Sequence, residues 1–186
     1  MRSVHRGIFF GRLRGEHRES LDARMERSRL MIAFKLLFSL VVCQITVVIG
    51  QVVSITRFEA WYINLQKPLL TVPTWLFLPL RSLTLFSMGI GLFFILIHTN
   101  KPQKVREVFI LFMIQLALNA MLNIIFLGFH SVFGGIMFSA SSLALAAIIT
   151  TKSFQISEIA GIMTFPYLFG MIYTVVFDIF LFIMNR

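Results

Sequence analysis

Three side-chain amides recur at a fixed interval inside one long apolar stretch of the sequence. Gln115, Asn119 and Asn123 are spaced four residues apart, so on a helix all three lie along one stripe. Amides in an apolar environment need hydrogen-bond partners, and they therefore face other helices or a cavity. The stripe predicts either hydrogen bonds between helices or a set of donors and acceptors for a bound ligand.

A carboxylic acid occurs in the last apolar stretch. Asp178 follows Tyr167 and Thr174 at helical spacing, so the three side chains share one face. An intramembrane carboxylate usually marks a functional site. The alternative is a hydrated group at the bilayer interface, because Asp178 lies about eight residues from the C-terminal end. Its carboxyl group is either protonated or paired with Arg81 or Lys67.

No catalytic constellation accompanies these groups. The histidines pair with no Cys or Ser at a triad spacing, and the sequence contains neither a phosphate-binding loop nor a Cys/His metal motif. The single cysteine, Cys43, excludes a disulfide within the chain. We therefore predict no catalytic residue, no bound metal and no required cofactor.

The elements that carry these polar groups must span a membrane. Of the 186 residues, 58% are hydrophobic and 13% are charged, against roughly 25% charged in a soluble domain. Five apolar runs approach or exceed the ~20 residues that cross a bilayer as a helix. We therefore predict an all-α integral membrane protein, a five-transmembrane-helix bundle with spans near Leu30–Val53, Phe77–Ile97, Val105–Leu127, Val132–Thr150 and Ile156–Met184.

Charge placement predicts how the chain is divided and oriented. Residues 1–29 form a basic polar tail, and residues 30–186 form the membrane domain. Thirteen of the 17 Lys and Arg residues lie on the side of the tail, which places the N-terminus in the cytoplasm by the positive-inside rule. The net charge of +9 thus reflects membrane topology, and the predicted partner is the lipid bilayer and no nucleic acid.

The link Thr56–Leu76 is the longest between two predicted spans. It contains both tryptophans, Trp61 and Trp75, and two prolines, Pro68 and Pro73. Tryptophan favours the bilayer interface, and proline stiffens the backbone. The link is predicted to be an ordered lid on one membrane face, and the alternative is an ordinary linker with interfacial anchors.

The same link carries a family resemblance. The sequences WYINLQKP (61–68) and VPTWLFLP (72–79) resemble the first loop of the translocator protein family, also called the tryptophan-rich sensory protein or TspO/MBR family. The segment QLALN (115–119), the pair Pro166-Tyr167 and Asn185 match the same pattern. The likeness runs from about residue 33 to 186. It implies a five-helix bundle, often a homodimer, with a ligand cavity under the first loop.

The resemblance also implies a function. Family members bind tetrapyrroles, sterols and synthetic aromatic ligands, so we expect a membrane receptor or translocator for porphyrin, haem or a similar flat apolar molecule. The alternatives are a light-dependent enzyme that degrades porphyrin oxidatively and a non-catalytic, stress-related regulatory scaffold. We favour a bacterial cell membrane, and in a eukaryote the mitochondrial outer membrane. The expected ligand-binding residues are Trp61, Lys67, Pro68, Trp75, Arg81, Gln115, Asn119, Leu122, Pro166, Tyr167, Thr174, Phe177 and Asp178.

Several positions depart from the family pattern. The family commonly has tryptophan where this chain has Leu70, Arg81, Leu122 and Gly170, and asparagine where it has Asp178. The loss of tryptophans weakens aromatic stacking and disfavours the photochemical alternative. A cation and a carboxylate enter or border the site instead. Arg81 either bonds a propionate of a porphyrin or extends to the bilayer interface.

Overall fold

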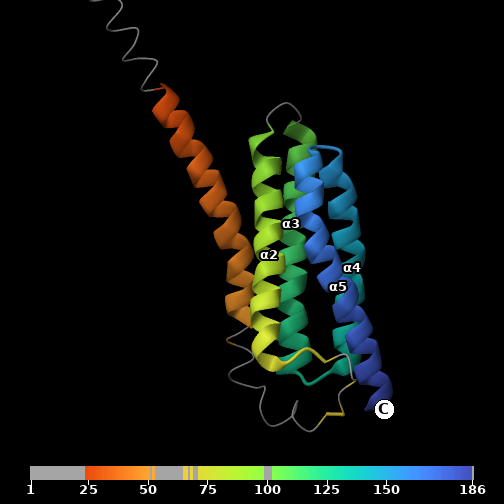
Figure 1. The fold of residues 1–186 in the computed structure, drawn as a ribbon. Helices are drawn as coiled ribbons and strands as arrows, with labels where there is room; N and C mark the ends of the chain where they lie inside the picture. Colours follow the sequence, from red (N-terminus) through yellow and green to blue (C-terminus); the bar gives the residue numbers. More distant parts are fainter. Residues whose placement is uncertain are drawn as a thin grey trace, which may run out of the picture.

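The computed structural model describes residues 24–50, 52, 65, 66, 68, 71–98 and 102–185, apart from the side chains of Thr74 and Leu127. This part of the chain is helical almost throughout (Figure 1). The elements are an N-terminal helix (Arg24–Gly50), α2 (Thr74–Ile97), α3 (Pro102–Asn123), a π-helical turn η1 (Ile124–Gly128), α4 (Val132–Phe154) and α5 (Glu158–Met184).

Five of the described helices are long and apolar enough to cross a bilayer. The predicted all-α five-helix membrane bundle is therefore confirmed. The described part of the N-terminal helix starts at Arg24, so residues 24–29 of the predicted polar tail are helical. Arg and Glu are good helix formers, which is why the loss of apolar character at residue 29 does not end the helix. The rest of the predicted tail lies outside the described residues.

The outer surface and the interior have the polarity expected for a protein dissolved in lipid. Phe34, Phe169 and Ile183 are 69%, 64% and 64% exposed, whereas Gln115 and Ser139 are 0% exposed. Large exposed apolar side chains would drive aggregation in water. Inside a bilayer they contact acyl chains, and polar groups gather between the helices instead.

Helices α2 to α5 lie side by side, with α5 contacting both α2 and α4, and α4 contacting α3 (Figure 1). Glycine permits the closest of these approaches. A Cβ atom at Gly91 would lie 3.2 Å from the backbone oxygen of Ala160 in α5. On the other side of α2, a Cβ atom at Gly89 would lie 3.2 Å from the backbone oxygen of Ser39. Gly89 and Gly91 thus allow α2 to pack closely against the N-terminal helix and α5.

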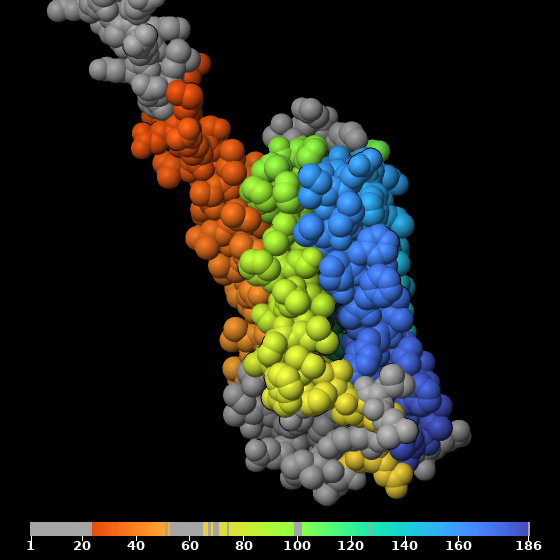
Figure 2. All heavy atoms as spheres, in the orientation of Figure 1, coloured from red at the N-terminus to blue at the C-terminus, as the bar shows by residue number. Residues whose placement is uncertain are grey.

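The N-terminal helix approaches α2 toward its own C-terminal end and diverges from it toward Arg24 (Figure 2). Lys35 bridges the two helices, since its Nζ donates a hydrogen bond of 2.9 Å to the backbone oxygen of Leu96. Gln44 donates a second bond of 3.3 Å to the backbone oxygen of Ser82. These polar contacts fix the N-terminal helix against α2 where apolar packing alone would be non-directional.

The two ends of the bundle differ in charge. The C-terminal ends of α2 and α4 lie at the end of the bundle where Arg24 of the N-terminal helix lies (Figure 1). Lys152 forms an ion pair of 2.9 Å with Glu107 at this end. The clustering of basic residues here agrees with the pattern from which we predict a cytoplasmic N-terminus, and the orientation itself stays a prediction.

Candidate functional site

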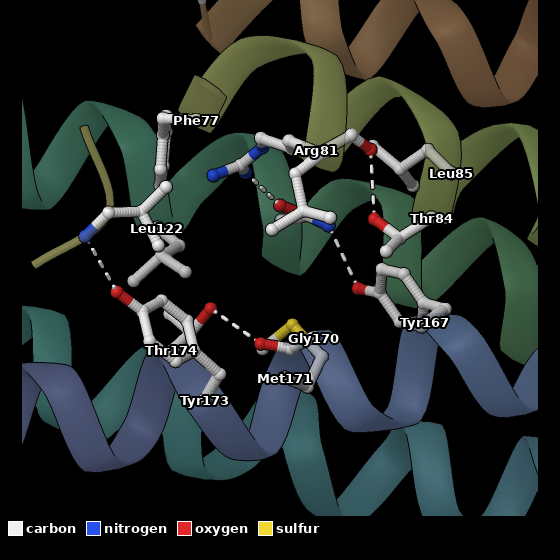
Figure 3. Close-up of a pocket in the computed structure, with 13 residues that line it drawn as sticks. Phe77, Arg81, Thr84, Leu85, Leu122, Tyr167, Gly170, Met171, Tyr173 and Thr174 are labelled. Carbon is white, nitrogen blue, oxygen red and sulfur yellow. Dashed lines mark hydrogen bonds between the residues drawn. The ribbon is translucent and has the colours of Figure 1, made fainter. Parts of the chain in front are cut away.

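A cavity lies between α2, α3 and α5, with Val72 of the segment before α2 also in its wall (Figure 3). It encloses about 60 Å³. Pockets that hold drug-sized ligands are roughly 300–1,000 Å³, so this cavity must widen to admit one. Its walls are Val72, Phe77, Leu80, Arg81, Thr84, Leu85, Asn119, Leu122, Tyr167, Gly170, Met171, Tyr173 and Thr174.

The inner wall of the cavity is tied together by a hydrogen-bonded cluster centred on Tyr167. Its hydroxyl oxygen accepts bonds from Gln115 Nε2 at 2.7 Å and from Asn119 Nδ2 at 2.8 Å. Gln115 Nε2 also donates to Ser142 Oγ at 2.7 Å. All four side chains are buried. Because the cluster joins α3, α4 and α5, it holds the Tyr167 ring in one position at the cavity wall.

The amide stripe thus has both of the roles predicted for it. Gln115 bonds between helices behind the cavity, whereas Asn119 bonds between helices and also lines the cavity. Asn123 turns back within the helix and donates to the backbone oxygen of Asn119 at 2.7 Å. Only the middle member of the stripe is therefore placed to touch a ligand.

Arg81 brings a cation to the cavity wall. Its guanidinium donates a hydrogen bond to Asn119 Oδ1 and lies 6.0 Å from the centre of the Phe77 ring. It lines the cavity among the other wall residues (Figure 3). Of the two alternatives for this side chain, extension to the bilayer interface does not occur in this structure. Arg81 instead points to the interior and leaves part of its fork available to a ligand.

Asp178 lies behind the cavity and is not among the wall residues. The side chain is 4% exposed, so the hydrated interfacial position is not adopted. Its carboxyl group hydrogen-bonds with Ser139 of α4 and interacts electrostatically with Arg81. Among the described residues, the one ion pair within 4.0 Å joins Lys152 and Glu107, so Asp178 and Arg81 do not form a direct pair. The alternative partner, Lys67, lies outside the described residues.

The first loop is fastened to α5 at two points, which we call the latch. The Asn185 side chain forms two hydrogen bonds with the backbone of Gln66, which we call the clasp. Asn185 Nδ2 donates to the backbone oxygen of Gln66, and the Gln66 N–H donates to Asn185 Oδ1, both at 2.9 Å. Nearer the cavity, the Val72 N–H donates to the Tyr173 hydroxyl oxygen at 3.3 Å. The latch therefore ties two described residues before α2 to α5, and most of the predicted lid lies outside the described residues.

The predicted site residues fall into three groups. The structure brings Arg81, Asn119, Leu122, Tyr167 and Thr174 together as cavity wall. Gln115 and Asp178 are buried behind that wall. Four other described residues, Pro68, Trp75, Pro166 and Phe177, are not part of the cavity wall. Trp61 and Lys67 are outside the described residues.

Four predicted residues are displaced from the wall for physical reasons. Trp75 is 74% exposed at the start of α2, as expected of an interfacial ring. Pro68 is buried in the loop, and Phe177 stacks on Tyr173 with ring centres 6.1 Å apart. Pro166 is exposed on α5. Ser87 of α2 donates to the backbone oxygen of Met163, in the turn before Pro166, at 2.7 Å.

Three further wall residues, Phe77, Thr84 and Tyr173, were not predicted from the sequence. Phe77 lies four residues before Arg81 and Thr84 three residues after it, so helical spacing from Arg81 could have found both. Tyr173 carried no such signal, because its position depends on the latch to Val72. Phe77, Tyr167 and Tyr173 supply aromatic surface in place of the missing tryptophans.

Comparison with known proteins gives the family. A sequence model of the TspO/MBR family matches residues 39–183, which include every wall residue of the cavity. The chain belongs to the TspO/MBR family. The Tryptophan-rich protein TspO of Archaeoglobus fulgidus is 26% identical over 136 residues, which make up 73% of this chain and 87% of that relative. Membership in the TspO/MBR family supports a membrane translocator or receptor kind of function.

Proposed function

We propose that this protein is a membrane receptor or translocator that binds a flat apolar ligand, such as a tetrapyrrole or a sterol, in the cavity between α2, α3 and α5. The observation that carries the proposal is how the cavity is built. Apolar side chains such as Leu85 and Met171 form its walls beside a small, fixed set of polar groups from Arg81, Asn119 and Tyr167. Sites for small molecules commonly combine these two features.

Binding requires the cavity to grow beyond its about 60 Å³. The inner wall resists this, because Tyr167 is cross-linked to α3 by two hydrogen bonds. The first loop is the easier boundary to move, since the bonds from Asn185 to Gln66 are exposed to solvent. Ligand entry is therefore proposed to open the latch and leave the polar cluster intact.

A cavity-filling substitution tests the location of the site. A Cβ atom at Gly170 would lie 3.5 Å from Thr84 Cγ2, an ordinary contact, so Gly170→Ala fits without rearrangement. Gly170→Leu adds three further carbons to a cavity of about 60 Å³ and fills it. We expect Gly170→Leu to weaken protoporphyrin binding by about tenfold or more, because a ligand must then displace packed atoms.

The measurement is a dark titration of detergent-purified protein with protoporphyrin, followed by the absorbance of the porphyrin. Trp75 is a poor reporter, because its exposed ring also responds to porphyrin in the detergent. Gly170→Ala is the matched control and should bind as the unmodified protein does. Equal affinity of all three proteins would place the ligand elsewhere and contradict the proposal.

Porphyrin degradation is expected to be absent. Within the described residues no tryptophan ring lines the cavity, so the aromatic partner invoked for the photochemistry is not supplied there. Illuminated protoporphyrin should lose absorbance in the presence of the protein no faster than in a detergent blank. Faster loss that Gly170→Leu suppresses would instead establish a light-dependent enzyme acting at this cavity.

The proposed setting is a lipid bilayer, the cell membrane of a bacterium or, in a eukaryote, the mitochondrial outer membrane. The five apolar spans support the bilayer. A homodimer stays part of the proposal on the family resemblance alone.

A further inference from the structure

The Arg81 guanidinium has more hydrogen-bond donors than partners. An arginine side chain carries five N–H donors in a planar fork. Within the described part of the chain its one hydrogen-bond acceptor is Asn119 Oδ1. The buried polar atoms that lack a partner there are Gln115 Oε1 and Asp178 Oδ2, so no nitrogen of Arg81 is both sealed and unpaired. The remaining N–H groups are therefore open to the cavity that Arg81 lines.

The surroundings of Arg81 favour an anion at that position. The guanidinium lies 6.0 Å from the Phe77 ring centre, and apolar Leu122 lines the same cavity. The cavity lies among helices that are apolar enough to span a bilayer, and electrostatic attraction is stronger in such low-dielectric surroundings than at a water-exposed surface. A carboxylate matches the fork of an arginine with two parallel bonds, a geometry that a neutral ester or hydroxyl cannot reproduce.

Asp178 does not occupy the free donors of Arg81. The residue is 4% exposed, and its Oδ2 atom has no hydrogen-bond partner among the described residues. The one ion pair within 4.0 Å among those residues joins Lys152 and Glu107, so the Arg81 guanidinium has no carboxylate partner there. Its charge is therefore available to the carboxylate of a ligand.

We propose that the cavity selects apolar ligands that carry a carboxylate, with Arg81 as the anchor for that carboxylate. The inference rests on the proposed function, since it assumes that this cavity is the ligand site. It narrows the ligand from any flat apolar molecule to an amphipathic acid. Arg81 keeps its bond to Asn119 and turns its free N–H groups to the acid.

The test compares 1-pyrenebutyric acid with its methyl ester, which replaces the charged carboxylate by a neutral group one methyl larger, at a pH where the acid is ionised. Binding is followed by pyrene fluorescence with the full-length protein in detergent. The unmodified protein should bind the acid about tenfold more tightly than the ester, the size expected of a hydrogen bond to a charged group. Arg81→Met should abolish that preference, so that acid and ester bind alike, whereas Arg81→Lys should keep part of it.

Arg106→Met is the matched control, because Arg106 is an exposed cation of α3 near the opposite end of the bundle, and neither affinity should change. A melting curve confirms that each variant is folded.

The outcomes separate the two proposals. Saturable binding of both probes with equal affinity, unaffected by Arg81→Lys, overturns the carboxylate anchor and leaves the cavity as a site for neutral ligands. Failure of the unmodified protein to bind either probe saturably overturns the acid selectivity. If protoporphyrin also fails to bind, the proposed function is overturned with it.

Discussion

Asn119→Leu is expected to destabilise the folded protein by about 2–3 kcal/mol, the size of a lost hydrogen bond to a charged group. Leucine is close to asparagine in shape but offers no polar atom. Arg81 would lose its acceptor, and the Tyr167 hydroxyl would lose one of its two donors. Both losses fall inside the bundle, where water cannot fully replace the missing partners. Chemical denaturation in a fixed detergent reports the free energy of unfolding.

The double variant Arg81→Met with Asn119→Leu identifies the cause. Replacing a buried polar pair by apolar residues of similar volume is often neutral or stabilising, whereas removing one partner is costly. The double variant should therefore recover most of the stability lost in Asn119→Leu. Ser141→Ala, at an exposed hydroxyl that bonds to its own helix, should change little. If the double variant is as unstable as Asn119→Leu, the lost stability comes from the changed side-chain shape at position 119 and not from the unpaired Arg81 guanidinium.

Opening the latch is expected to speed ligand release by about tenfold, because two or three hydrogen bonds of roughly 0.5–1 kcal/mol each would be lost. The variant is Asn185→Ala combined with Tyr173→Phe. It removes the clasp on the Gln66 backbone and the acceptor for the Val72 N–H. The association rate should rise by a similar factor, so affinity should change less than either rate. Stopped-flow fluorescence with a pyrene probe measures both rates.

Gln66→Ala is the control for the latch. Asn185 bonds the backbone atoms of Gln66, so removing the Gln66 side chain keeps the clasp. Its rates should match those of the unmodified protein. Asn185 also donates to the Leu181 oxygen at the end of α5 at 2.8 Å, so a melting curve should accompany Asn185→Ala. Unchanged rates in a folded double variant would mean that ligands enter by another route, such as between helices.

The membrane class and the helices could be predicted from the sequence because a transmembrane helix is specified by its own residues and needs no information about its neighbours. Every backbone polar group in hydrocarbon must be satisfied within its own helix, so a long apolar run specifies a span without knowledge of its neighbours. Five runs became five spans. The start of the first helix could not be predicted in this way, because the polar residues 24–29 are also helical although the apolar run starts at Leu30.

Part of the candidate site could be predicted in the same way. Asn119 and Tyr167 each belong to a polar stripe on one helical face, and the structure joins the two stripes through a bond of 2.8 Å. Trp75 and Pro166 were predicted from the family pattern, yet they do not line the cavity. Their residue types suit an interfacial anchor and an interrupted helix as well as a ligand contact, so type alone cannot decide between these roles.

By itself the sequence determined the solvent of this protein, its five spans and the helical faces on which its polar groups lie. These follow from local composition and helical periodicity. Only the tertiary structure decided that Arg81 turns inward to Asn119, that Asp178 is sealed behind the cavity and that Asn185 clasps Gln66. Each of these depends on contacts between segments far apart in the chain. Hydrogen bonds and charge interactions act over a few ångströms, so their partners are fixed only when the helices pack.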